Sequence, residues 1–139
     1  MIEKALYQYL SDQTSITDIT GTRIYPHHLP QSVTSYPVLT ITLVSNSHGH
    51  HLTSASGETT ARVQLDSWSE SLSDAVSLAE AVRGELQGFS GTMDTVTIHF
   101  IQLDNEQNLS EPPIDASDDW MYRKSQDFLV KYSETIPSF

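Results

Sequence analysis

Cysteine is absent from this chain of 139 residues. Its absence excludes a disulfide framework, a thiolate metal site and a thiol nucleophile. A chain of this length is close to the size of one typical domain. We therefore expect a single domain over residues 1–139 whose stability comes from packing alone.

Basic residues are scarce, because 7 Lys and Arg stand against 18 Asp and Glu, which gives a formal net charge of −11. Proteins that hold nucleic acid through its phosphates rely on clustered Lys and Arg. The composition therefore argues against a nucleic-acid-binding protein. We expect most of this surface to repel duplex DNA.

Long hydrophobic runs are also missing. No apolar stretch approaches the roughly 20 residues needed to cross a bilayer, and even the stretch 38–44 is interrupted by Thr40 and Thr42. The N-terminus lacks the basic and apolar regions of a secretory signal. We expect a soluble protein that is made in a cytoplasm and has no membrane partner.

The spacing of apolar residues predicts two helices. In residues 2–11 the apolar side chains follow the i, i+3, i+4, i+7 pattern that places them along one side of a helix. Residues 72–86 carry a similar stripe. Ser71 and Asp74 have capping-box spacing at its start, and Gly88 is placed to end it.

Alternation of apolar and polar residues predicts four strands, over 37–44, 61–66, 96–100 and 122–132. Repeated Gly and Pro in residues 12–36 predict a long connection of turns and extended pieces. The polar segments 45–58 and 105–119 read as long loops. The order helix, two strands, helix, two strands predicts an α+β fold, in which an antiparallel β-sheet of about four strands has two helices packed on one face.

The sharpest candidate for a chemical site is the histidine-rich segment 48–51. Neutral imidazoles close together on a flexible loop can bind zinc or nickel, and His48, His50 and His51 are supplemented by Glu58. A structural zinc site usually has four ligands, and the chain has no cysteine to complete the set. The ordinary interpretation is a solvated loop, so we assign no metal and no cofactor.

Carboxylates are plentiful, but nothing in the sequence makes them converge. Glu70 and Asp74 are four residues apart on the second helix, where a solvated helix face is the ordinary interpretation. The acidic residues after Asp104 lack EF-hand spacing, and the chain has no G-x-S-x-G, Walker or G-x-G-x-x-G motif. We predict a non-enzymatic protein without catalytic residues. A small metal-dependent enzyme using the 48–51 histidines and Glu58 stays open as an alternative.

Three segments, taken in order, point to a family. They are Gly21-Thr22-Arg23-Ile24-Tyr25-Pro26 leading to Pro30-Gln31 and Tyr36-Pro37; Arg62-Val63-Gln64-Leu65-Asp66 and Trp68, running into Asp74-Ala75 and 78–83; and Tyr122-Arg123-Lys124-Ser125 through Asp127-Phe128 to Tyr132. Together they resemble the tail-completion, or tail-terminator, proteins of long-tailed bacteriophages. The resemblance covers most of the chain between residues 21 and 132.

This resemblance implies a virion assembly protein at the head–tail junction, assembled in the host cytoplasm. Subunits of the family form a ring, hexameric by resemblance, that caps the tail tube, stops its polymerisation and meets the head connector. The implied partners are further copies of the chain, the tail tube protein and the head–tail connector proteins. A head–tail joining subunit of the neck, on the portal side, is the alternative within the virion.

Long loops in small proteins tend to be functional, so both predicted loops are candidate interfaces. The candidate interface residues are His48, His50, His51, Glu58, Asp115, Asp118 and Asp119. Genomic DNA passes through such a ring without specific binding, and a lumen lined with carboxylates would repel its phosphates. The candidate lumen residues are Asp74, Glu80 and Glu85 on the second helix, and the loop from Asp115 to Asp119 is the alternative lining.

Overall fold

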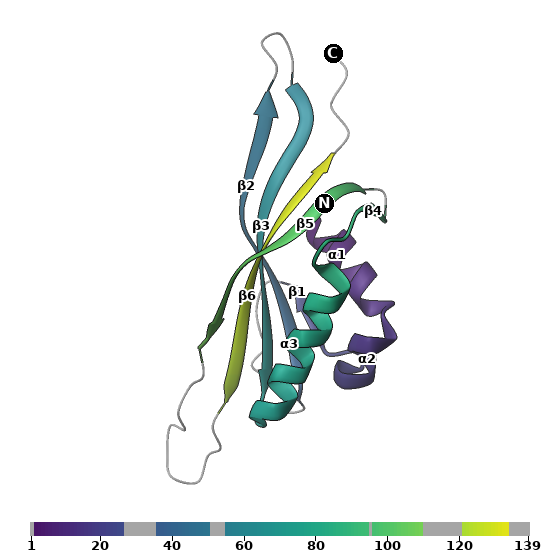
Figure 1. Cartoon of the computed structure of the whole chain (residues 1–139). Helices are drawn as coiled ribbons and strands as arrows, with labels where there is room; N and C mark the ends of the chain where they lie inside the picture. The colour runs from purple at the N-terminus through teal and green to yellow at the C-terminus, as the bar shows by residue number, and fades with distance from the viewer. Residues whose placement is uncertain (1, 27–35, 51–54, 95, 110–120, 134–139) are drawn as a thin grey trace.

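The computed structural model describes residues 2–26, 36–50, 55–94, 96–109 and 121–133, with side chains described throughout except at 48–50 and 55–58. The elements in chain order are α1 (Ile2–Ser11), α2 (Thr14–Thr20), β1 (Ile24–Pro26), β2 (Val38–His50), β3 (Ala55–Ser69), α3 (Leu72–Leu86), β4 (Gly91–Met93), β5 (Val96–Asn108) and β6 (Tyr122–Ser133). The six strands form one sheet in the order β1-β2-β3-β6-β5-β4 (Figure 1). β1 runs parallel to β2, and all other neighbours are antiparallel.

The predicted fold class is therefore wrong. The described part of the chain has a mixed sheet of six strands and three helices, in place of four antiparallel strands and two helices. The helices over 2–11 and 72–86 are confirmed. The Ser71 hydroxyl accepts a hydrogen bond from the Asp74 backbone N–H at the start of α3. Gly88 follows the end of α3 at φ 81°, a conformation that glycine adopts without steric cost.

The unpredicted helix, α2, lies in the segment where Gly and Pro predicted only turns and extended pieces. Its sequence, Thr-Ser-Ile-Thr-Asp-Ile-Thr, is rich in residues of low helix propensity. Ile16 and Thr20 are nevertheless fully buried. Burial against the rest of the protein stabilises this helix, and a pattern search along the chain does not detect that contribution.

Three strands are longer than their apolar patterns predicted. β2 continues to His50, β3 begins at Ala55 and β5 continues to Asn108, so parts of both predicted loops are strand. The side chains from Val44 to Ser47 and from Asp104 to Asn108 are exposed. Pairing with a neighbouring strand satisfies part of the backbone of these extensions, and polar side chains suit them because no core covers them.

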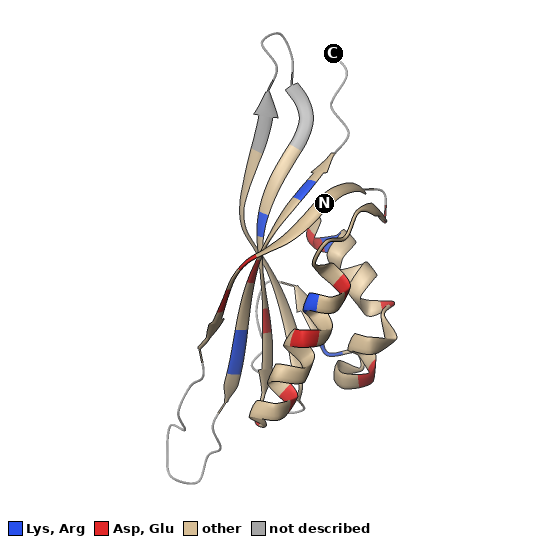
Figure 2. Cartoon of the chain, viewed as in Figure 1, with Lys and Arg blue, Asp and Glu red and all other residues tan. Residues whose placement is uncertain are grey.

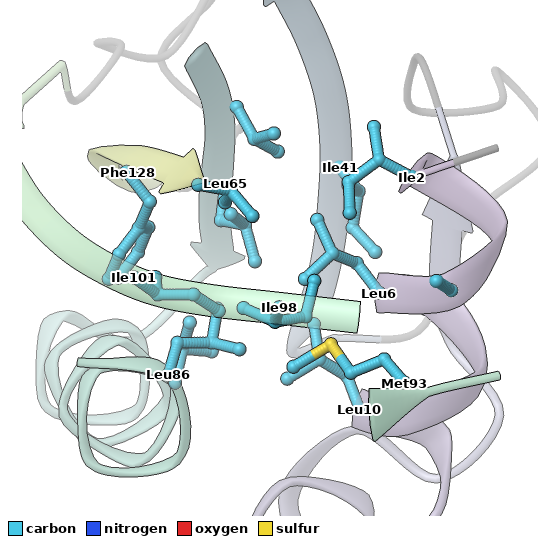
Figure 3. Close-up of a cluster of buried hydrophobic side chains, with 14 of the residues drawn as sticks. Ile2, Leu6, Leu10, Ile41, Leu65, Leu86, Met93, Ile98, Ile101 and Phe128 are labelled. Atoms are coloured by element: carbon cyan, nitrogen blue, oxygen red, sulfur yellow. The ribbon is translucent and has the colours of Figure 1, made fainter. Parts of the chain in front are cut away.

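All three helices lie on one side of the sheet (Figure 1). The core between helices and sheet is apolar, and Figure 3 shows how side chains from α1, α3 and five strands meet there. Its large buried members include Ile2, Leu6, Leu10, Ile41, Leu65, Leu86, Met93, Ile98 and Phe128. None of the described helices has the length and apolarity that a membrane crossing requires.

The sheet is strongly twisted, and its long strands extend past the helices at both ends. In Figure 1 the ends of β2 and β3 project beyond the helix layer on one side, and the ends of β5 and β6 project on the other. Register shifts lie at Leu43/Ser45 in β2 and at Leu103/Asn105 in β5. Such bulges increase local twist. Two strand pairs therefore stand out from the compact half of the molecule.

Candidate assembly surfaces

A polar cluster lies on the sheet face that the helices leave open. Leu65 belongs to the core, so strand alternation places Asp66 on the opposite face. The register sets Asp66 next to Thr40 of β2, and Trp68 next to Arg123 of β6. Three adjacent strands therefore contribute side chains to one cluster.

Every described contact in this cluster joins neighbouring strands or residues. The Arg123 Nη2 lies 3.1 Å from the Asp66 Oδ2, and the guanidinium carbon lies 4.7 Å from the Trp68 ring centroid. The Trp68 indole N–H donates to the Thr40 hydroxyl at 3.1 Å, and the Gln64 amide donates to Asp66 at 3.0 Å. Asp66 is only 3% exposed. A buried carboxylate needs such partners, so the cluster holds strands together and offers no free catalytic group.

A second ion pair lies nearer the strand ends. The Arg62 Nη1 is 2.8 Å from the Asp104 Oδ2 and 3.8 Å from the Asp127 Oδ2. About a third of each of the closer two side chains is exposed, at 34% and 36%. Exposed pairs contribute little stability. One cation here faces two carboxylates, so the arrangement partly neutralises negative charge on the open face of β3, β5 and β6.

α3 carries both exposed carboxylates and a carboxylate that accepts hydrogen bonds from the other helices. Figure 2 shows acidic residues along α3, where Asp74 and Glu80 are exposed. Glu85 is half-buried and accepts a hydrogen bond from the Ser15 hydroxyl at 2.7 Å. The Tyr9 hydroxyl lies 3.5 Å from its other oxygen. Of the three predicted lumen residues, Glu85 is thus tied to α1 and α2, whereas Asp74 and Glu80 face solvent.

Tyr9 of α1 contacts α3 and has a raised pKa. Burial, followed by the negative charge of Glu85 and the hydrogen bond to it, raises the pKa of the Tyr9 hydroxyl above its ordinary value of 10.0. The ring also packs edge-on against Phe89, with centroids 5.0 Å apart. These contacts join α1 to α3 through Glu85 and to the segment after α3 through Phe89, so they serve a structural purpose.

A shallow, open hollow lies on the exposed side of α3 near its C-terminal end. It is lined by Glu80, Arg83, Gly84, Gln87 and Gly88. No heavy atom lies within 4 Å of a Cβ built on Gly84. The hollow is too open to enclose a small molecule, and it suits contact with another macromolecule better than substrate binding.

Three of the predicted interface residues lie in the projecting parts of β2 and β3, and four lie outside the described residues. His48 pairs with Thr59 and His50 pairs with Ala55 in the extended part of β2 and β3, and Glu58 pairs with Ser133. The positions predicted at His51, Asp115, Asp118 and Asp119 lie outside the described residues. Among the residues that are described, no group of three or more His, Asp or Glu is placed to hold a metal ion.

The two long, partly uncovered sheet edges were not predicted from the sequence. β1 covers only Leu39–Ile41 of β2, and β4 covers only Val96–Ile98 of β5. Both covering strands have three residues, whereas the strands that they cover have 13 each. The segment Leu-Asp-Asn-Glu-Gln-Asn at the end of β5 has no apolar alternation after its first residue, so the sequence carried no strand signal there.

The chain matches a protein family model and is similar to solved structures. The family model of "Tail completion protein gp17" matches residues 4–128. No curated protein sequence matches the chain. A solved chain from the virion of a native gene transfer agent (GTA) particle is similar, with a TM-score of 0.74 and 15% identity, over 96% of this chain and 95% of that one. At this identity the likeness shows the fold alone.

Proposed function

The chain belongs to the tail completion protein gp17 family and is a structural protein of the phage tail, and from this premise we propose that its subunits form a hexameric ring at the head-proximal end of the tail. The ring caps the tail tube, stops its polymerisation and joins the tail to the head connector. The family match carries the proposal, because residues 4–128 run from α1 into β6 and so span nearly the whole described fold.

The polar clusters support a contact function over a catalytic one. Arg123 contacts both Asp66 and Trp68 across neighbouring strands. Arg62 and Asp104 are likewise paired with each other. Their contacts with one another stabilise the sheet, which is a structural purpose.

The acidic composition has a use in such a ring. DNA that passes through a lumen encounters the lining side chains, and carboxylates there repel phosphates. Asp74 and Glu80 are the strongest lumen candidates on α3, because their carboxylates are exposed. Glu85 is the weakest of the three, because it accepts hydrogen bonds from α1 and α2.

Contacts with the tube and the connector are proposed for the ends of the long strands. One contact region is the end of β2, the start of β3 and the segment that joins them, with His48, His50, His51 and Glu58. The segment between β5 and β6, with Asp115, Asp118 and Asp119, is the other. In Figure 1 the described strands leading to these segments extend toward opposite ends of the molecule. One subunit can therefore meet two different neighbours along the tail axis.

A subunit of the neck, bound to the portal side, is the alternative within the same virion. The two roles differ in the first partner that the purified protein binds. Co-sedimentation with purified tail tubes and with portal complexes separates them, since a tail terminator binds tubes and a neck subunit binds portal complexes.

The ring itself is tested by sedimentation velocity over a wide concentration range, with and without EDTA and with and without tail tubes. A ring-sized species, or a ring-sized increment on the tubes, is the expected result in both buffers. A mass that falls on adding EDTA would instead assign the assembly to a metal held by the 48–51 histidines. A monomer that never binds tubes contradicts the proposal.

A further inference from the structure

One long edge of the sheet is formed by the second half of β2. β1 pairs with β2 at Leu39, Thr40 and Ile41. From Leu43 to His50, the described residues place no strand beside β2 on the side away from β3. This half of β2 projects past the helices (Figure 1). Within the described part of the chain, its backbone is therefore available for pairing with another chain.

The other long edge is formed by the second half of β5. β4 pairs with β5 only from Val96 to Ile98, and the Gly88 backbone N–H donates to the Ile101 carbonyl just beyond. From Gln102 to Gln107, the described chain offers β5 no strand partner other than β6. Uncovered strand edges of this length are open to pairing with other chains, and folded proteins usually protect them.

We propose that these two edges pair with each other between neighbouring subunits, β2 from Leu43 to His50 against β5 from Gln102 to Gln107 of the next copy. The inference rests on the proposed ring function and names the surface through which the ring closes. It joins one patch to a different patch, which is the heterologous interface that a cyclic assembly requires.

Strand direction permits this pairing. β2, β3, β6 and β5 alternate in direction across the sheet. A copy related by rotation about an axis roughly parallel to the strands therefore presents its β2 antiparallel to the β5 edge. The sheet then continues from subunit to subunit without a change in pairing type. Pairing of β2 with β2 would instead leave every β5 edge uncovered.

The positions of the two edges fit a closed ring. Register through Val63 and Phe128 puts Leu43 and Leu103 at the same level of the sheet. Each uncovered segment extends mainly from that level toward its own C-terminal end, so their centres are offset by about four residues, or about 13 Å. The four strands from β2 to β5 span about 19 Å laterally. Matching the offset requires a strand tilt of about 35°, at the lower limit of closed β-barrels.

Charge favours this pairing over the symmetric one. The β5 segment contains Asp104 and Glu106 and no basic residue, whereas the β2 segment contains no acidic residue and includes His48 and His50. Pairing β5 with another β5 would oppose like charges across strands, which is destabilising. Pairing β5 with β2 avoids that repulsion.

The bulges at the two edges are consistent with curvature. Of the two register shifts in each strand, those at Leu43/Ser45 and Leu103/Asn105 lie at nearly the same level of the sheet, and the others lie at His48/His50 and Ile98/Phe100. Bulges are common at barrel rims, where they bend and twist the strands. Two bulges at one level would curve the shared sheet around the ring.

The absence of native cysteine allows a direct test by disulfide cross-linking. Ser45 and Ser47 of β2, and Gln102 and Asn105 of β5, are exposed and share the open face of the sheet by register. Double variants combining one cysteine on β2 with one on β5 are oxidised under mild conditions. β3 and β6 separate the two strands within a subunit, so an intramolecular disulfide is out of reach.

The expected result is a ladder of covalent oligomers from at least one double variant. Each single variant should give no species larger than a dimer, and a mixture of a β2 single variant with a β5 single variant should give the mixed dimer. The matched control pairs Gln102→Cys with Ser77→Cys, which places an equally exposed cysteine on α3. It should give no ladder.

Sedimentation velocity of the same unoxidised samples separates the two possible failures. A ring-sized mass without a ladder from any β2–β5 combination overturns the edge pairing and leaves the ring function standing. A monomer at every concentration that also fails to bind or cross-link on tail tubes overturns the ring function, and the edge pairing with it.

Discussion

The Arg123 guanidinium lies over the Trp68 ring at 4.7 Å from its centroid while its Nη2 contacts the Asp66 carboxylate at 3.1 Å. One side chain of β6 thus holds two residues of β3. Both contacts are made on the sheet face without helices, where an apolar core cannot supply the stability. When a carboxylate is nearly buried, removing the cation paired with it destabilises the fold more than replacing the whole pair does.

Arg123→Ala should destabilise the protein by about 2 kcal/mol, because it leaves the Asp66 carboxylate without its cation. The figure is set below that of a fully buried pair, since 24% of the Arg123 side chain is exposed. Urea unfolding measures the change. Arg62→Ala is the matched control and should cost about 0.5 kcal/mol or less, because its pair is exposed. Equal losses in the two variants contradict this account.

Gly84→Ala should stabilise the protein by about 0.5–1 kcal/mol, because alanine restricts the unfolded chain and favours helix. A Cβ at Gly84 meets no atom within 4 Å. Gly88→Ala is the control with the opposite sign, since its φ of 81° strains any side chain. Thermal and urea unfolding compare them. Loss of stability at Gly84 would show that the α3 surface is not as open as described.

Glu85→Gln should lower the pKa of Tyr9, because the negative charge and the hydrogen bond of Glu85 both contribute to raising it. Ultraviolet titration of tyrosinate absorbance measures the change. Glu80→Gln removes an equal charge from an exposed position of α3 and should leave the titration of Tyr9 unchanged. Identical curves for the two variants would argue against the Tyr9–Glu85 contact.

The same contact predicts a loss of stability in alkaline solution. The folded-state pKa of Tyr9 is raised, so its contribution is fully present below pH 10.0 and is lost as the pH rises through the higher folded-state value. Tyr9→Phe should therefore flatten the decline in the free energy of unfolding above pH 10. Urea unfolding at a series of pH values checks this. An unchanged slope in Tyr9→Phe contradicts the assignment of this decline to Tyr9. Burial and the negative charge of Glu70 also raise the pKa of Tyr36, so Tyr36→Phe is the comparison variant.

Glu80→Lys should reduce genome delivery if α3 lines the lumen, because a cation there attracts the phosphates of the passing DNA. Infectivity of particles assembled with the variant is the readout, and sedimentation confirms that the ring still forms. Asp18→Lys makes the same charge change at an exposed position on α2. Equal infectivity of the two variants would remove Glu80 from the lumen.

Local patterns predicted α1 and α3 because the signals for these two helices lie within their own residues. The apolar stripe and the Ser71 cap are contained within the residues of α3 itself. α2 lacks such a signal, and its Thr-rich sequence folds as a helix because Ile16 and Thr20 are buried against the rest of the protein. The family resemblance rested on residues such as Arg23, whose guanidinium donates to the Pro37 carbonyl. That contact serves the fold and identifies no partner.

The sequence by itself determined the acidic composition, two of the three described helices, the central parts of the long strands and the family. Each of these depends on composition or on short-range periodicity. Only the tertiary structure decided how far the polar strands extend, which sheet face stays open, and that β1 and β4 leave half of β2 and β5 uncovered. Those features depend on backbone pairing between residues far apart in the chain. A local pattern of side chains does not specify that pairing.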